Sequence, residues 1–138
     1  MRKEVNIEWK GDMAFNAQIG THSIVLDATE DSGGHNLGPT PKPLILAALG
    51  GCTGMDVISI LKKMRIVPDY FNVKTEAVMR EEHPKRYTHI KVCYEFKGHN
   101  LELEKLQNAV NLSVDKYCGV IATLAPSVKM EYEIKILE

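Results

Sequence analysis

The sequence predicts an α+β fold with a mainly antiparallel sheet, and the spacing of its apolar residues carries that prediction. Residues 44–61 repeat apolar side chains at three- and four-residue steps, which is typical of a helix. Segments that alternate apolar and polar side chains lie before this helix and on both sides of a second helical segment. The resulting order is strands, helix, strands, helix, strand, without the regular alternation of a parallel nucleotide-binding fold.

The central helix is expected over about residues 41–65. Pro41 and Pro43 lie where the first turn of a helix tolerates proline, and Lys62 and Lys63 complement the negative end of the helix dipole. Apolar residues occupy more than one face of this helix, so we expect it to be buried nearly all round.

The few polar side chains of this helix share one stripe. Cys52 directly follows the Gly50-Gly51 pair, and Asp56 and Ser59 follow it at i+4 and i+7. The only thiol of the helix therefore lies beside its polar groups, and we look for chemistry there.

The other elements are predicted from alternation, helical spacing and turn residues. Strands are expected at 5–9, 15–19, 22–27, 70–82, 86–97 and 128–136, a loop at 29–40, and a helix at 101–117 that breaks at Cys118-Gly119 and resumes to residue 124.

Size and charge restrict the function. The chain has 138 residues, predicting one domain over 1–138, and its 17 basic and 18 acidic residues give a net charge of -1 with no basic run. We therefore expect no nucleic-acid partner. Asp56 near the middle of the apolar helix argues against a membrane span. Three cysteines without a paired framework, and no apolar leader, predict a cytoplasmic protein.

Cys52 and Cys118 each lie next to glycine, and two interpretations of them remain open. Both could be small core residues, or they could form a redox pair if folding brings them together. Cys93 shares its strand face with His89 and Lys91, which marks it as a bystander. No His or Cys pair has a zinc-ligand spacing, so no metal or other cofactor is expected.

Three segments resemble a known family. The segments PLILAALGGCTGMDVISILKKMR, REEHPKRYTHI and LSVDKYCGVIATL are similar to the OsmC/Ohr superfamily, and most closely to its YhfA-like branch. The resemblance implies an OsmC-like fold and an intertwined homodimer with two active sites at its interface. It also implies that Cys52 attacks organic hydroperoxides and that Cys118 resolves the sulfenic acid, with an unidentified thiol reductant restoring the pair.

The chain departs from the peroxidases of that family at two places. Residues 4–27 contain no arginine to stabilise a thiolate, and the helix start at residues 41–43 has no carboxylate to fix one. The prediction is a thiol-dependent peroxidase, and the alternative is a non-catalytic homodimer that binds a small hydrophobic ligand or senses redox state. Candidate cations for stabilising the Cys52 thiolate are Lys42, Arg80, Lys116, His22 and His35.

Overall fold

The computed structural model describes residues 1–138, and these separate into two compact units, Met1–Ile45 and Leu46–Glu138. Each unit holds one three-stranded sheet, and the boundary falls inside the long helix α1 (Pro41–Lys63). Sheets and helices in this order confirm the predicted α+β class, with three of the four strand pairings antiparallel. That the chain forms a single domain stays a prediction.

The first unit contains the predicted N-terminal meander. Strands β1 (Asn6–Trp9), β2 (Phe15–Ile19) and β3 (His22–Leu26) pair antiparallel in chain order. A short 3-10 turn, η1 (Glu30–Ser32), interrupts the segment that was expected to be a plain loop. Glycine at position 33 adopts a positive φ of 89° at the end of this turn, a conformation that a side chain would strain.

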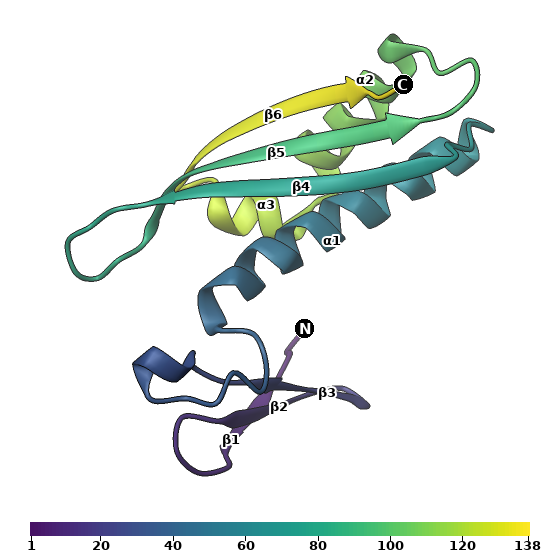
Figure 1. Ribbon diagram of the computed structural model, residues 1–138. Helices are drawn as coiled ribbons and strands as arrows, with labels where there is room; N and C mark the ends of the chain where they lie inside the picture. Colours follow the sequence, from purple (N-terminus) through teal and green to yellow (C-terminus); the bar gives the residue numbers. More distant parts are fainter. The chain divides into compact units, whose positions relative to one another are not determined.

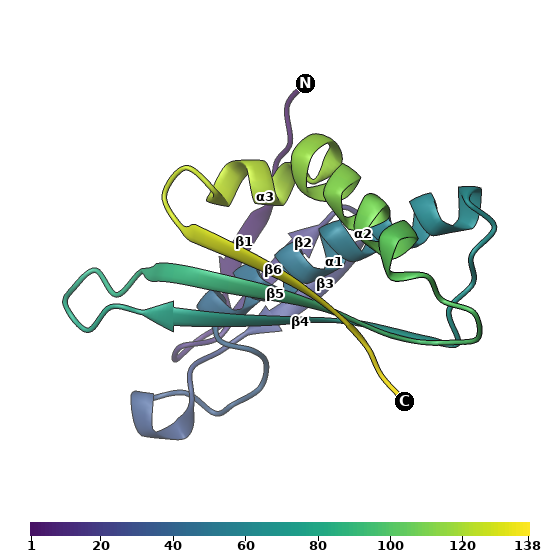
Figure 2. The same ribbon diagram turned by 90° about the horizontal axis from the view of Figure 1, so that it is seen from above.

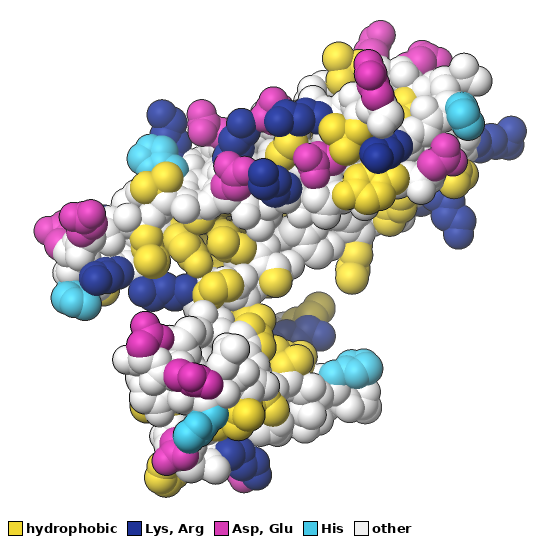
Figure 3. Space-filling model, in the orientation of Figure 1, with side chains coloured by type: hydrophobic (Ala, Val, Ile, Leu, Met, Phe, Trp, Pro, Cys, Tyr) yellow, Lys and Arg dark blue, Asp and Glu magenta, His cyan; other side chains and the backbone are white.

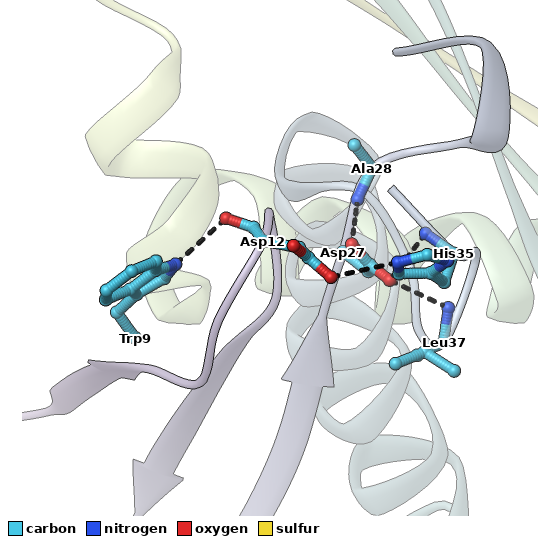
Figure 4. A network of polar contacts seen from close by, with 6 residues as sticks. All are labelled: Trp9, Asp12, Asp27, Ala28, His35 and Leu37. Carbon is cyan, nitrogen blue, oxygen red and sulfur yellow. Dashed lines mark hydrogen bonds and ion pairs between the residues drawn. The ribbon is translucent and has the colours of Figure 1, made fainter. Parts of the chain in front are cut away.

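Asp27 organises the loop that follows β3 (Figure 4). Its carboxylate accepts hydrogen bonds from the backbone N–H groups of Ala28 (2.8 Å), His35 (3.1 Å) and Leu37 (3.2 Å). The His35 ring also lies 3.0 Å from the Asp12 carboxylate. Burial alone would raise the pKa of Asp27, but the three backbone donors outweigh it and hold that pKa below its ordinary value.

The second unit is built on a sheet with strand order β4-β5-β6. Strands β4 (Tyr70–Met79) and β5 (Tyr87–Lys97) form the predicted antiparallel hairpin. Strand β6 (Lys129–Ile136) pairs parallel with β5, a direction that was not predicted from the sequence. Periodicity shows that a strand exists, but its direction depends on the crossover through the helices in between.

The helical segment between β5 and β6 is broken as predicted. Helix α2 (Leu103–Leu112) leads into a π-helical turn, η2 (Ser113–Tyr117), and α3 (Gly119–Leu124) starts after Cys118. Figures 1 and 2 show the helices of this unit lying along one face of its sheet. The core fills the space between them and includes fully buried side chains of α1, β5 and α2, among them Leu49, Val57, Tyr94, Phe96 and Leu106.

Helix α1 confirms the predicted central helix but not its expected burial. Its buried residues form a single stripe at four-residue steps, Leu49, Thr53, Val57 and Leu61. The three-stranded sheet and α2 cover only this side, and Met55 on the other side is 74% exposed. By length and composition alone this helix, with a mean hydropathy of 1.9 over 18 residues, would also pass as a membrane span.

We expect Asp27→Asn to destabilise the first unit at neutral pH, because the amide has one acceptor oxygen in place of two. Since the pKa of Asp27 is lowered in the folded chain, its stabilising effect is present above the unfolded value of about 3.9 and is lost as the pH falls through the folded value. The difference between variant and wild type should therefore shrink in acid.

Urea unfolding followed by the fluorescence of Trp9, the only tryptophan, measures this at several pH values. Asp31→Asn, which changes an exposed carboxylate of η1, is the matched control and should leave the midpoint unchanged. An equal effect of Asp27→Asn at pH 7 and pH 3 would contradict the role given to the carboxylate.

Candidate functional site

The structure brings Cys52 and Cys118 together, although 66 positions separate them in the sequence. Cys52 lies half-buried in the middle of α1, and Cys118 is buried between η2 and α3. Their sulfurs and a carboxylate oxygen of Asp56 all lie within 4.8 Å of one another. Ser59, the last residue of the predicted polar stripe, lines a small pocket beside Asp56.

Backbone hydrogen bonds hold Cys118 in place. Its N–H donates to the carbonyl of Ser113 at 2.8 Å, across the π-helical turn. Its sulfur caps the start of α3 by accepting a hydrogen bond from the N–H of Ile121 at 3.4 Å. π-Helical turns are rare and are often found at functional sites, so the local geometry of Cys118 is consistent with a functional residue.

A chain of buried hydroxyl groups lies next to the two cysteines. Thr53 Oγ1 is 2.8 Å from the hydroxyl of Tyr94 and 2.7 Å from Ser113 Oγ, which donates to Asp56 Oδ2 at 2.9 Å. Because the carboxylate only accepts, the hydrogens must point in sequence from Tyr94 to Thr53, from Thr53 to Ser113 and from Ser113 to Asp56. The network thus converges on Asp56 and orients it.

Thr53, Ser113 and Tyr94 were not among the site residues predicted from the sequence. A weak signal existed for Thr53, because it is the only polar side chain at the four-residue steps of an otherwise apolar stripe. No such signal marked Ser113 and Tyr94, since their roles depend on contacts across 41 to 60 positions.

Burial sets the protonation of two groups at the site. It raises the pKa of the Cys118 thiol to about 11, and the neighbouring Cys52 adds to the shift. It also raises the pKa of Tyr94 to about 12. At neutral pH Cys118 is therefore a thiol and Tyr94 a phenol, and each can donate a hydrogen.

Several of the cations expected near Cys52 are engaged elsewhere. Arg80 donates to the carbonyl of Pro84 at 2.7 Å in its own hairpin, and the ammonium of Lys116 lies 5.3 Å from the ring centroid of Tyr117. A third candidate cation, His35, lies 3.0 Å from the carboxylate of Asp12 in the first unit. A different cation lies beside the polar stripe: the side chain of Lys63 lines a pocket of about 130 Å³ together with Asp56, Ser59, Ile60 and Tyr117.

Cys93 lies apart from the two helix-associated thiols. It pairs in register with Lys74 of β4 and Glu133 of β6, on a sheet face where Lys91 and Glu133 form a 2.7 Å ion pair. Figure 3 shows charged side chains over the outer face of the sheet. Cys93 is only 6% exposed beneath them, and burial raises its pKa. The predicted separation of Cys93 from the pair is confirmed.

The fold and site define a class of small α+β proteins with a cysteine in a long central helix and a second cysteine against it. The family model described as "OsmC-like protein" matches residues 33–133, and the chain belongs to that family.

Relatives and solved structures agree with this assignment. Protein YhfA of Escherichia coli strain K12 is 31% identical over 135 residues, covering 97% of this chain and 98% of YhfA. A hypothetical protein from Aquifex aeolicus VF5 has a structure with a TM-score of 0.87 at 31% identity, covering 99% of this chain and 97% of its own. The organic hydroperoxide resistance protein OhrB of Bacillus subtilis shares the fold, with a TM-score of 0.66 at 16% identity and coverage of 95% and 97%.

We expect Thr53→Val to destabilise the second unit by about 1–3 kcal/mol, because it leaves the buried hydroxyl of Tyr94 without its partner. Thr53→Ser keeps the hydroxyl and loses one methyl group, so it should retain most of the stability. Chemical denaturation of both variants, followed by far-UV dichroism, compares them. Equal losses in the two variants would mean that the methyl group, and not the hydrogen bonds, stabilises the site.

Proposed function

We propose that this protein is a thiol-dependent peroxidase that reduces organic hydroperoxides at the Cys52–Cys118 pair. The observation that carries the proposal is the approach of the two sulfurs to within 4.8 Å, with Asp56 beside them. A disulfide needs a sulfur separation of about 2.05 Å, so a small local movement suffices to join them.

The reaction balances over two steps. The Cys52 thiolate attacks the terminal oxygen of the hydroperoxide, the O–O bond breaks, and the alcohol leaves after taking up a proton. Cys52 is then a sulfenic acid, and attack by Cys118 on its sulfur forms the disulfide and releases water. An external thiol reductant returns the two electrons.

The difference in solvent exposure supports the assignment of the two roles. Cys52 is half-buried on α1, whereas Cys118 is buried and keeps its proton at neutral pH. The more accessible thiol is thus the one that meets the oxidant first. The buried thiol lies beside it; its proton must be released as its sulfur attacks the sulfenic acid, and the oxygen then leaves as water.

The family relationship adds support, and the residues of this chain differ from those of the family's peroxidases at two places. Solved structures with this fold are named organic hydroperoxide resistance proteins, in Bacillus subtilis and in Elizabethkingia anophelis. The arginine and glutamate that activate the peroxidases of the family have no counterpart at residues 4–27 and 41–43. In their place, the hydroxyl chain that ends on Asp56, with Lys63 lining the same small pocket, is the polar environment available to the thiol.

We also propose that two copies associate through the uncovered face of α1. A groove of about 540 Å³ runs between α1 and β4, with Gly50, Gly51 and Gly54 among its lining residues. A Cβ on Gly54 would lie 3.3 Å from the Val73 side chain, whereas a Cβ on Gly51 would meet nothing. The contact with Val73 accounts for a glycine at position 54. No contact within the chain accounts for Gly51, and the absence of a side chain there would let a second α1 approach closely. The apolar side chains below the sheet in Figure 3 match such a surface.

A reducing compartment suits this chemistry, because the protein depends on a thiol reductant to restore Cys52 and Cys118. We accordingly place it in the cytoplasm, and propose neither nucleic acid nor a membrane as its partner.

We expect stoichiometric cumene hydroperoxide to remove two free thiols per chain and to join Cys52 to Cys118. Cys118→Ser should instead accumulate a sulfenic acid on Cys52, and Cys52→Ser should abolish the fast reaction. Mass spectrometry after alkylation and proteolysis identifies each product.

Cys93→Ser is the matched control, because Cys93 is the third cysteine and lies on the charged face of the sheet. Its turnover of hydroperoxide should stay within about twofold of wild type. If Cys52 and Cys118 both remain reduced in the treated wild type, the non-catalytic homodimer that binds a small hydrophobic ligand becomes the better account.

For the homodimer, we expect Met55→Lys to weaken association by about tenfold or more, because it places a charge on the exposed apolar face of α1. Leu103→Lys, at a 55% exposed position of α2, is the control and should leave the dimer intact. Sedimentation equilibrium measures both. A wild-type chain that stays monomeric at micromolar concentration contradicts the proposal.

A further inference from the structure

We propose that the reduced protein binds one Zn²⁺ ion through Cys52, Asp56 and Cys118. The inference rests on the geometry of these three side chains and stands whether or not the protein is a peroxidase. No metal was predicted from the sequence, because Cys52 and Cys118 are 66 positions apart. Folding removes that objection by bringing three potential ligand atoms within 4.8 Å of one another.

The ligand set and its spacing suit zinc. Zinc is bound tetrahedrally, with Zn–S bonds of about 2.3 Å and Zn–O bonds of about 2.0–2.2 Å. Two sulfurs on one tetrahedral zinc are therefore about 3.8 Å apart, which is compatible with Cys52 and Cys118 sulfurs that lie within 4.8 Å of each other. Two thiolates favour zinc over magnesium or calcium, which prefer oxygen ligands alone.

Groups around the ligands orient them, as they do in established metal sites. Ser113 Oγ donates to Asp56 Oδ2 at 2.9 Å, which fixes the carboxylate and leaves its other oxygen free for a metal. The N–H of Ile121 donates to the sulfur of Cys118 at 3.4 Å, and hydrogen bonds of this kind stabilise a thiolate. The hydroxyl chain through Thr53 and Tyr94 anchors Ser113 in turn.

Three protein ligands leave a fourth tetrahedral position open. Cys52 and Asp56 are half-buried, so solvent reaches this side of the cluster. A small pocket lies beside Asp56 and is lined by Lys63 and Tyr117 as well. Two thiolates and one carboxylate carry three negative charges, and bound Zn²⁺ would leave a net charge of -1. The cationic Lys63 lines the pocket beside Asp56 and would partly balance this charge.

Zinc binding and disulfide formation use the same sulfurs and exclude each other. Binding releases one proton from each thiol and involves no change of oxidation state. Disulfide formation removes two electrons from the pair and leaves no thiolate for the metal. Bound zinc should therefore shield the cysteines from hydroperoxide, and an oxidant that reaches them should release the metal.

The test uses Co²⁺ as a spectroscopic probe and Zn²⁺ as its competitor. Reduced protein should take up one Co²⁺ per chain with thiolate-to-cobalt charge-transfer absorption in the near ultraviolet, and Zn²⁺ should displace it. Cys52→Ser and Cys118→Ser should each lose most of this absorption, while Cys93→Ser keeps it. Asp56→Asn should weaken binding by about tenfold or more, against no change for the exposed control Asp115→Asn.

Far-UV dichroism checks that each variant is folded. A further variant, Ser113→Ala, changes no metal ligand but removes the hydrogen bond to Asp56, and it should weaken binding by about tenfold. Absence of charge-transfer absorption in reduced wild type overturns the zinc site, as does absorption that survives in the folded Cys52→Ser variant. Hydroperoxide oxidation is measured separately on metal-free protein. A chain that forms the disulfide but binds no Co²⁺ refutes this inference alone, and the reverse result refutes the peroxidase alone.

Discussion

The arrangement of the site depends on the hydrogen bonds of the Thr53 hydroxyl. This hydroxyl joins three separate elements, because it reaches Tyr94 on β5 and Ser113 at the start of the π-helical turn from its own position on α1. Thr53 is the next residue after Cys52, and Ser113 accepts the backbone hydrogen bond of Cys118. The bond between the two hydroxyls therefore holds the backbone of each cysteine near that of the other. Because the network is buried, removing one hydroxyl leaves its partner without a hydrogen bond, which costs free energy. The folded state is therefore most stable when all members of the network are present.

The sequence was sufficient for what depends on local pattern and insufficient for what depends on long-range contact. The bounds of α1, the hairpin strands β4 and β5 and the break at Cys118 followed from spacing, proline and glycine, each of which acts on its own neighbours. The parallel pairing of β6 with β5 did not, because the direction of a strand is set by the path of α2 and α3 between them. The proximity of Cys118 to Cys52 and Asp56 could not be predicted for the same reason, although Cys52 and Asp56 could be placed on one helix face.

Cys93 shows that a residue on the polar face of a strand can still be buried. Alternation correctly placed Cys93 on the polar face of β5, yet the side chain is nearly inaccessible. Its neighbours on that face carry long charged side chains such as Lys91 and Glu133, whose aliphatic parts cover a short residue between them while their charges pair at the surface. A small thiol among such residues is protected without being part of the core. Its burial therefore tells nothing about the chemistry of the Cys52–Cys118 pair.

The two proposed uses of the cluster place different demands on its flexibility. Cys52 and Asp56 are fixed to each other one turn apart on α1, a 23-residue helix whose buried stripe packs in the core. Cys118 lies between a five-residue π-helical turn and a six-residue helix, which have fewer internal hydrogen bonds to break. Any closing of the sulfur separation must therefore come mainly from the Cys118 side. A disulfide requires closure to about 2.05 Å, whereas zinc accepts about 3.8 Å, so metal binding asks for less movement of that junction than oxidation does.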